Sequence, residues 1–94
     1  MSNLVRVEAL IKGMVQGVGY RWFATRAASK YSISGYITNL TNGDVKTVVE
    51  GEQGMVSDFL KELRTGPPSA SVSGIQIEKG EYTGEYKGFG VEYF

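Results

Sequence analysis

The apolar residues of this chain switch twice from a spacing of two to a spacing of about 3.6, and this double switch limits the folds it can adopt. Alternating segments predict half-buried strands, whereas helical spacing predicts amphipathic helices. The two strand–helix–strand units are joined by Asn42-Gly43, a dipeptide typical of a tight hairpin. The expected strands are 5–12, 33–39, 45–51, 72–79 and a short last one at 89–93, and the expected helices are 20–31 and a second from Met55 that stops at Gly66-Pro67-Pro68.

This order predicts a ferredoxin-like α+β sandwich, with an antiparallel sheet in the order 4-1-3-2, two helices on one face and a short final strand. The first and second strands then both flank the third and run in the same direction. The loop after strand one and the hairpin after strand two therefore leave the same end of the sheet, roughly 10 Å apart. We expect a single domain over residues 1–94, because a chain of this length buries one modest core.

Composition restricts the chemistry. The chain has no Cys and no His, so it lacks thiol nucleophiles, disulfides, the usual near-neutral acid–base group and the ligands of most zinc sites. Any catalysis must use Arg, Lys, carboxylates, amides, hydroxyls or the backbone. The basic and acidic residues balance to a formal net charge of zero, which argues against non-specific binding to nucleic acid or to an anionic membrane.

Neither a membrane span nor a signal peptide is expected. No apolar stretch approaches the roughly 20 residues that cross a bilayer, and the N-terminus lacks the basic, apolar and small-residue regions of a secretory signal. We therefore expect a cytoplasmic protein, and a monomer, with neither a nucleic-acid nor a membrane partner.

The loop at residues 13–19 carries a functional signal, because it is Gly-rich and leads straight into the predicted helix, with Arg21 in the first turn. The N–H groups at a helix start have no internal partner and can converge on an anion. The Arg21 guanidinium suits two phosphate oxygens. Neither the P-loop sequence nor the full dinucleotide-binding fingerprint is present. The loop predicts a phosphate or carboxylate site; the alternative is a tight turn beside a solvated arginine.

Asn39 ends the second predicted strand, at the end of the sheet where this loop emerges. Its amide could cap the Asn42-Gly43 turn, or it could donate and accept at once and so hold a water for attack. Arg21 and Asn39 would suffice for the hydrolysis of an acyl phosphate. Its leaving group is a carboxylate, whose conjugate acid has a pKa of about 4, so it leaves without a proton donor. Catalysis then requires mainly charge neutralisation and positioning of the reactants.

These residues resemble those of the acylphosphatases. The first motif of that family, Gly followed by Val-Gln-Gly-Val-x-Phe-Arg, stands here as Gly13 and then residues 15–21. Its second motif, Gly-x-Val-x-Asn with a further Gly-x-Val, stands here as Gly35, Ile37, Asn39, Gly43 and Val45. The chain length, the element order, the Gly-Pro after the second helix and the closing strand also agree. The departures are Tyr20 in place of Phe, Ile37 in place of Val and Asn42 in place of Asp.

The resemblance implies hydrolysis of the carboxyl–phosphate bond of a small-molecule acyl phosphate, without a metal or other cofactor. By match of position, Arg21 would clamp the phosphate and Asn39 would orient the attacking water. The phosphate-binding residues implied in the same way are Gln16, Gly17, Val18, Gly19, Tyr20 and Arg21.

Other functions are considered for the same fold. A non-catalytic module that binds an anion or small metabolite would use the same loop. An RNA-binding module needs aromatic residues on its central strands, and residues 45–51 have none. A third alternative is an acylphosphatase-like domain that serves a larger enzyme of carbamoyl transfer.

Several expectations concern residues away from this site. Trp22 is interpreted as a packing residue at the rim, and residues 80–88 as a mobile surface loop. The hydroxyl of Tyr20 must reach water or a partner. Four carboxylates, interpreted as solvated, are Asp44, Glu50, Glu52 and Asp58.

Overall fold

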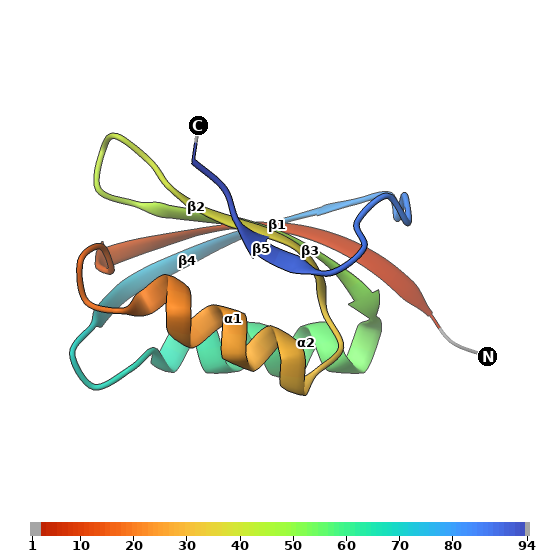
Figure 1. Ribbon diagram of the computed structural model, residues 1–94, viewed down its shortest axis with the longest axis horizontal. Coiled ribbons are helices and arrows are strands. Elements are labelled where there is room, and N and C mark those ends of the chain that lie inside the picture. Colours follow the sequence, from red (N-terminus) through yellow and green to blue (C-terminus); the bar gives the residue numbers. More distant parts are fainter. Residues whose placement is uncertain (1–2, 94) are drawn as a thin grey trace.

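The computed structural model describes residues 3–93, which form a twisted sheet with both helices packed on one face (Figure 1). Each predicted element is present; four of them extend one or two residues beyond the prediction, and the helix predicted at 20–31 and the strands predicted at 33–39 and 89–93 are one or two residues shorter. The elements are β1 (Leu4–Met14), α1 (Tyr20–Lys30), β2 (Ser34–Asn39), β3 (Val45–Glu52), α2 (Gln53–Thr65), β4 (Ser71–Gly80) and β5 (Phe89–Val91).

The strand order is β4-β1-β3-β2-β5, which confirms the predicted 4-1-3-2 arrangement of a ferredoxin-like sandwich. β1 pairs antiparallel with β3 and β4, and β2 pairs antiparallel with β3. The short final strand, β5, pairs with β2 in parallel. β4 ends at the end of the sheet where β1 and β2 begin. The chain therefore reaches the free edge of β2 at the start of that strand, and β5 runs parallel to β2.

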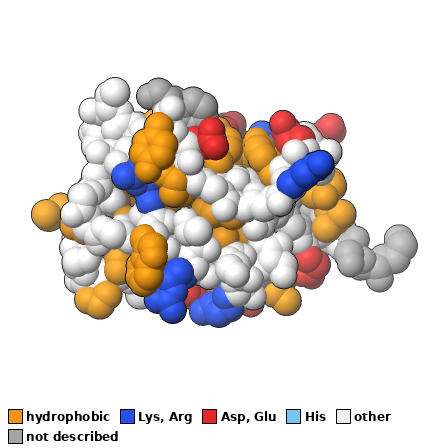
Figure 2. Space-filling view, in the orientation of Figure 1, with side chains coloured by type: hydrophobic (Ala, Val, Ile, Leu, Met, Phe, Trp, Pro, Cys, Tyr) orange, Lys and Arg blue, Asp and Glu red, His pale blue; other side chains and the backbone are white. Residues whose placement is uncertain are grey.

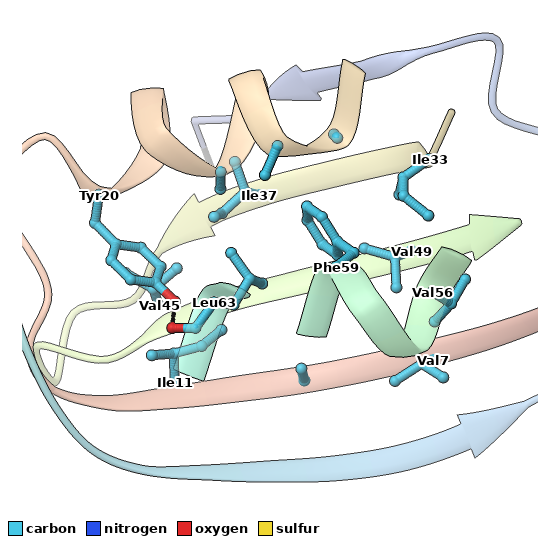
Figure 3. Packing of buried hydrophobic residues seen from close by; sticks show 14 of the residues in the cluster. Val7, Ile11, Tyr20, Ile33, Ile37, Val45, Val49, Val56, Phe59 and Leu63 are labelled. Carbon is cyan, nitrogen blue, oxygen red and sulfur yellow. Dashed lines mark hydrogen bonds between the residues drawn. The ribbon is translucent and has the colours of Figure 1, made fainter. Parts of the chain in front are cut away.

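The core lies between the sheet and the helices. Alternate residues of β1 are buried on the helix side, namely Val7, Ala9 and Ile11, as the two-residue period predicts. Ala24 and Ala28 on α1 are fully buried, and their small side chains let the helix lie close to the strands. From α2, Phe59 fills the centre of the core (Figure 3). Its ring also meets the ring of Phe89 on β5 edge to face.

The end of β1 is bent by an irregularity in its pairing with β4. Lys12 lies opposite Gly74 and Gly13 opposite Val72, so Ser73 is an extra residue on β4. A bulge increases local twist and re-aims the strand that follows, and here it lies immediately before the Gly-rich loop.

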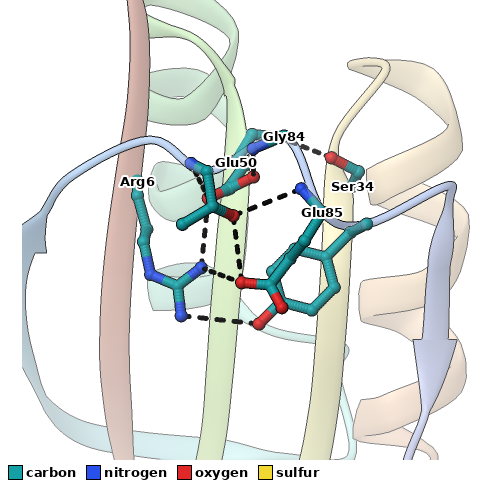
Figure 4. A network of polar contacts seen from close by, with 7 residues as sticks. Arg6, Ser34, Glu50, Gly84 and Glu85 are labelled. Atoms are coloured by element: carbon teal, nitrogen blue, oxygen red, sulfur yellow. Dashed lines mark hydrogen bonds and ion pairs between the residues drawn. The ribbon is translucent and has the colours of Figure 1, made fainter.

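The prediction that Glu50 is solvated is wrong. Glu50 lies on the face of the sheet away from the helices and its side chain is 0% exposed, because the loop between β4 and β5 covers it (Figure 4). The carboxylate accepts hydrogen bonds from the Arg6 guanidinium at 3.0 Å, from the Thr83 backbone and hydroxyl at 2.8 and 2.9 Å, and from the Gly84 backbone at 3.0 Å.

Asp44 is half-buried and pairs with Lys12 at 2.9 Å, so it is only partly solvated. Glu52 and Asp58 are exposed, as predicted, and Glu52 is also the N-cap of α2, where its side chain accepts from the Gly54 backbone at 3.1 Å. Neither helix of the described residues is long and apolar enough to cross a membrane.

Candidate active site

The loop between β1 and α1 places two glycines in a left-handed conformation at the start of the helix. Gly17 has φ 72° and Gly19, the N-cap residue, has φ 75°. A Cβ at either position would meet nothing within 4 Å, so the backbone conformation, not lack of space, favours glycine there. The loop backbone is consequently open on its outer side.

The start of α1 is left without an internal cap. No side chain of residues 3–93 accepts a hydrogen bond there, and the first turn contains no acidic residue. The N–H groups of the first turn therefore have no helical partner and carry the positive end of the helix dipole. An anion in front of this turn would supply the missing acceptors.

An open cavity of about 390 Å³ lies against this loop, in the size range of small-molecule sites. Residues from the loop, the first turns of α1 and the C-terminal segment line it, and none of them carries a carboxylate. They are Val15, Gly17, Gly19, Tyr20, Arg21, Trp22, Thr25, Val91 and Tyr93.

A slightly larger cavity, about 410 Å³, lies between α1 and α2. Its lining includes the carboxylates of Asp58 and Glu62, and Glu62 also pairs with Lys30 at 2.6 Å. The two carboxylates repel an anionic ligand. The cavity at the loop is the better phosphate site despite its smaller volume.

Arg21 is half-buried in the lining of the loop cavity and forms no ion pair with any residue between 3 and 93. Its guanidinium carbon lies 5.3 Å from the ring centroid of Tyr93. A cation in the first turn of a helix costs about 0.3–1 kcal/mol, and a cation–π contact at an exposed site offsets about the same amount. The charge of Arg21 is therefore available to a ligand.

Gln16 connects the loop to the hairpin between β2 and β3. Its side-chain amide donates to the backbone oxygens of Leu40 at 2.7 Å and Asp44 at 2.8 Å. The side chains of Gln16 and Val18 do not line the cavity; Val18 packs against the core, and its backbone oxygen accepts from Ser69 at 2.8 Å. Of the predicted phosphate residues, the cavity lining thus includes Gly17, Gly19, Tyr20 and Arg21.

Asn39 ends β2 opposite Val45 and shares the helix-covered face of the sheet with Ile37. Its Oδ1 atom is the only buried side-chain N or O atom in the described part of the chain without a hydrogen-bond partner. The hairpin turn is instead closed by Asn42, whose Oδ1 accepts from the Asp44 backbone at 3.0 Å. A buried, unpaired acceptor costs about 1–3 kcal/mol, which is offset when a water or ligand binds it.

Tyr20, the first residue of α1, has its hydroxyl directed into the protein. The hydroxyl donates to the backbone oxygen of Leu63 at 2.6 Å (Figure 3). Residue 67 would normally supply the helical donor to that oxygen, but it is a proline and has no N–H. Burial raises the pKa of Tyr20, so the hydroxyl remains a donor. The contact ties the start of α1 to the end of α2.

The sequence did not identify the C-terminal wall of the cavity. Val91 and Tyr93 reach it only because β5 pairs with β2, and no local pattern indicates that pairing. Thr25 could have been found, since it lies one helical turn after Arg21. Trp22 lies at the rim, as predicted, but it is 65% exposed and so contributes little to packing. Residues 3–93 contain no group of three or more acidic side chains that could hold a metal ion.

Comparisons with known proteins agree along nearly the whole chain. A model of the acylphosphatase family matches residues 7–91. An acylphosphatase of Geotalea uraniireducens is 42% identical over 89 residues, which cover 95% of this chain and 98% of that protein. One of Thermus thermophilus is 45% identical over 86 residues, covering 92% and 97%. The crystal structure of acylphosphatase from Bacillus subtilis superposes with a TM-score of 0.91 at 26% identity, covering 95% of this chain and 99% of that one.

Proposed function

This chain belongs to the acylphosphatase family and hydrolyses acyl phosphates to a carboxylate and inorganic phosphate, and we propose that Arg21 and Asn39 are its catalytic residues. The phosphoryl group binds in front of α1, on the backbone N–H groups of residues 16–21 and across the Arg21 guanidinium. A non-catalytic role is not favoured, because the curated relatives match over nearly their full length and are named acylphosphatases.

One observation carries the assignment: the uncapped start of α1, the left-handed glycines and an arginine without an ion pair all border a single cavity. Each element alone would be weak support. Together they provide several donors and one fixed positive charge within the same open space, with no carboxylate in the lining. This arrangement suits a phosphoryl group, whose oxygens need both charge and hydrogen bonds.

In the proposed reaction, Asn39 holds the attacking water through its unpartnered Oδ1. The water oxygen bonds to phosphorus as the bond from phosphorus to the acyl oxygen breaks; that electron pair leaves with the carboxylate, and the proton that the water loses passes to solvent. No acid is needed for a leaving group of such low basicity. The loop and Arg21 neutralise charge on the phosphoryl oxygens, which is the main catalytic requirement of phosphoryl transfer.

Gln16 has a positioning role in this scheme. Its two hydrogen bonds hold the hairpin against the loop, and the hairpin follows directly from Asn39. The side chain thus fixes where the water-binding residue lies relative to the phosphate loop, although it does not border the cavity itself.

The wider organisation of the protein is also proposed. One core unites all seven elements of residues 3–93, which supports a single domain. We expect this domain to act as a monomer in the cytoplasm, on a small-molecule substrate and without a metal, a nucleic acid or a membrane.

The test is phosphate release from benzoyl phosphate, with and without a chelator, by the wild type and two variants. We expect chelator-insensitive turnover in the wild type. Arg21→Ala should lower kcat and raise KM together, since its charge acts in the ground and transition states. Asn39→Ala should lower kcat and leave inhibition by inorganic phosphate near its original strength. Arg64→Ala, which removes an exposed charge from the last turn of α2, is the control. An unchanged kcat in Asn39→Ala would refute the role of that residue.

A further inference from the structure

The proposed mechanism assigns no catalytic or phosphate-binding role to several of the nine residues that line the cavity. The phosphoryl group lies, in that proposal, against Gly17, Gly19 and Arg21. Four other residues of the lining, Trp22, Thr25, Val91 and Tyr93, do not bind it. We call these four residues the acyl wall.

The acyl wall is predominantly apolar and aromatic. Trp22 is 65% exposed and Tyr93 81% exposed, so both side chains present large surfaces to solvent. The hydroxyl of Thr25 donates to the backbone oxygen of Arg21 at 2.8 Å and is therefore occupied within the helix. Val91 adds an aliphatic surface from β5. The wall offers contact area and little polar recognition.

Both aromatic residues of the wall also contact an arginine. The guanidinium of Arg26 lies 4.8 Å from the ring centroid of Trp22, and that of Arg21 lies 5.3 Å from the centroid of Tyr93. Arg26 lines the neighbouring cavity and not this one, so it meets Trp22 from outside the substrate site. Figure 2 shows hydrophobic and basic side chains lying side by side over α1 and below the C-terminal segment. These contacts restrict the two rings before a ligand arrives.

An acyl phosphate bound by its phosphoryl group must direct its acyl group out of the phosphate loop. We propose that the acyl group lies against Trp22 and Tyr93, and that these residues make the enzyme select aromatic and bulky apolar acyl phosphates over small ones. The assignment rests on the proposed phosphate site. Stacked and edge-to-face aromatic contacts stabilise bound rings, whereas an acetyl group is too small to gain from them.

The first experiment compares kcat/KM for benzoyl phosphate and acetyl phosphate in the wild type and in Trp22→Ala, Tyr93→Ala and Trp22→Phe. For Trp22→Ala we expect the benzoyl value to fall about three- to tenfold, mainly through KM, with the acetyl value within about twofold of the wild type. Tyr93→Ala also removes the ring that contacts Arg21, so we expect both values to fall, the benzoyl value more than the acetyl value. Trp22→Phe should keep most of the selectivity. Met55→Ala, at an exposed apolar residue of α2, is the control and should change neither value.

The outcomes separate this inference from the site on which it rests. If both alanine variants leave the ratio of the two kcat/KM values unchanged while Arg21→Ala lowers both values, the acyl wall is refuted and the phosphate site stands. If Arg21→Ala lowers neither value, the phosphate site itself is wrong. Equal losses for both substrates in Trp22→Ala would mean that the residue supports the loop and does not select the acyl group.

A direct binding measurement is available, because Trp22 is the only tryptophan of the chain. Benzylphosphonate has no carboxyl–phosphate bond and cannot be hydrolysed there. Titration with it should change the intrinsic fluorescence more than titration with methylphosphonate at the same degree of saturation. Equal changes for the two phosphonates would contradict contact between the ring and Trp22.

Discussion

The hydroxyl of Tyr20 replaces a backbone donor that the sequence has removed, and Tyr20→Phe tests this. The carbonyl of Leu63 lies in the last turn of α2, where Pro67 cannot donate to it, and the hydroxyl is 2.6 Å away. Both residues are buried. The substitution removes one hydrogen bond, which contributes about 0.5–1.5 kcal/mol net, and leaves a buried carbonyl unpaired at a cost of about 1–3 kcal/mol. Because water can partly hydrate the carbonyl that loses its donor, we expect the free energy of unfolding to fall by about 2 kcal/mol.

This loss should be visible in urea and thermal unfolding. In a domain of this size 1 kcal/mol shifts Tm by about 4–8 °C, so Tm should fall by about 10 °C. Activity well below Tm should change less than about twofold, since the hydroxyl faces away from the cavity. Tyr82→Phe, at a tyrosine that is 44% exposed, should leave stability unchanged. A loss below about 0.5 kcal/mol in Tyr20→Phe would show that the hydroxyl does not substitute for the missing donor.

Two further predictions concern the polar contacts of the fold. Burial opposes the charge of Glu50, but hydrogen bonds from Thr83, Arg6 and Gly84 outweigh it and lower its pKa below 4.5. The ionised Glu50 therefore stabilises the fold fully above pH 4.5, and this stabilisation is lost as pH falls through the lowered pKa. In urea titrations at several pH values, Glu50→Gln should make the loss of stability in acid less steep. An equally steep acid loss in the variant would refute this. Gln16→Ala should lower the free energy of unfolding by about 1–2 kcal/mol and should lower kcat/KM. Unchanged kinetics would refute the positioning role of Gln16.

The local pattern of the sequence was sufficient to predict the helices, the longer strands and their order. The alternation of Val7, Ala9 and Ile11 set the buried face of β1, and Asn42-Gly43 fixed the hairpin between β2 and β3. Once the order 4-1-3-2 was known, the shared end of β1 and β2 followed from strand direction alone. The hydrogen bonds from Gln16 to the hairpin agree with that deduction.

Features that depend on contacts between distant segments were missed or misjudged. Glu50 was interpreted as solvated, together with three other carboxylates, and only the loop that carries Thr83 buries it. Tyr93 reaches the cavity through the parallel pairing of β5, which no local period signals. The partner of the Tyr20 hydroxyl, which the sequence required but could not name, is a carbonyl of α2.

The central claim is that the phosphoryl group binds at the start of α1, and titration of the ¹⁵N-labelled protein with inorganic phosphate tests it most directly. The account predicts saturable shifts of the backbone amide resonances that are largest at residues 17–21 and that disappear in Arg21→Ala. Shifts that are largest instead at the cavity between α1 and α2, or that persist with the same affinity in Arg21→Ala, would contradict this claim.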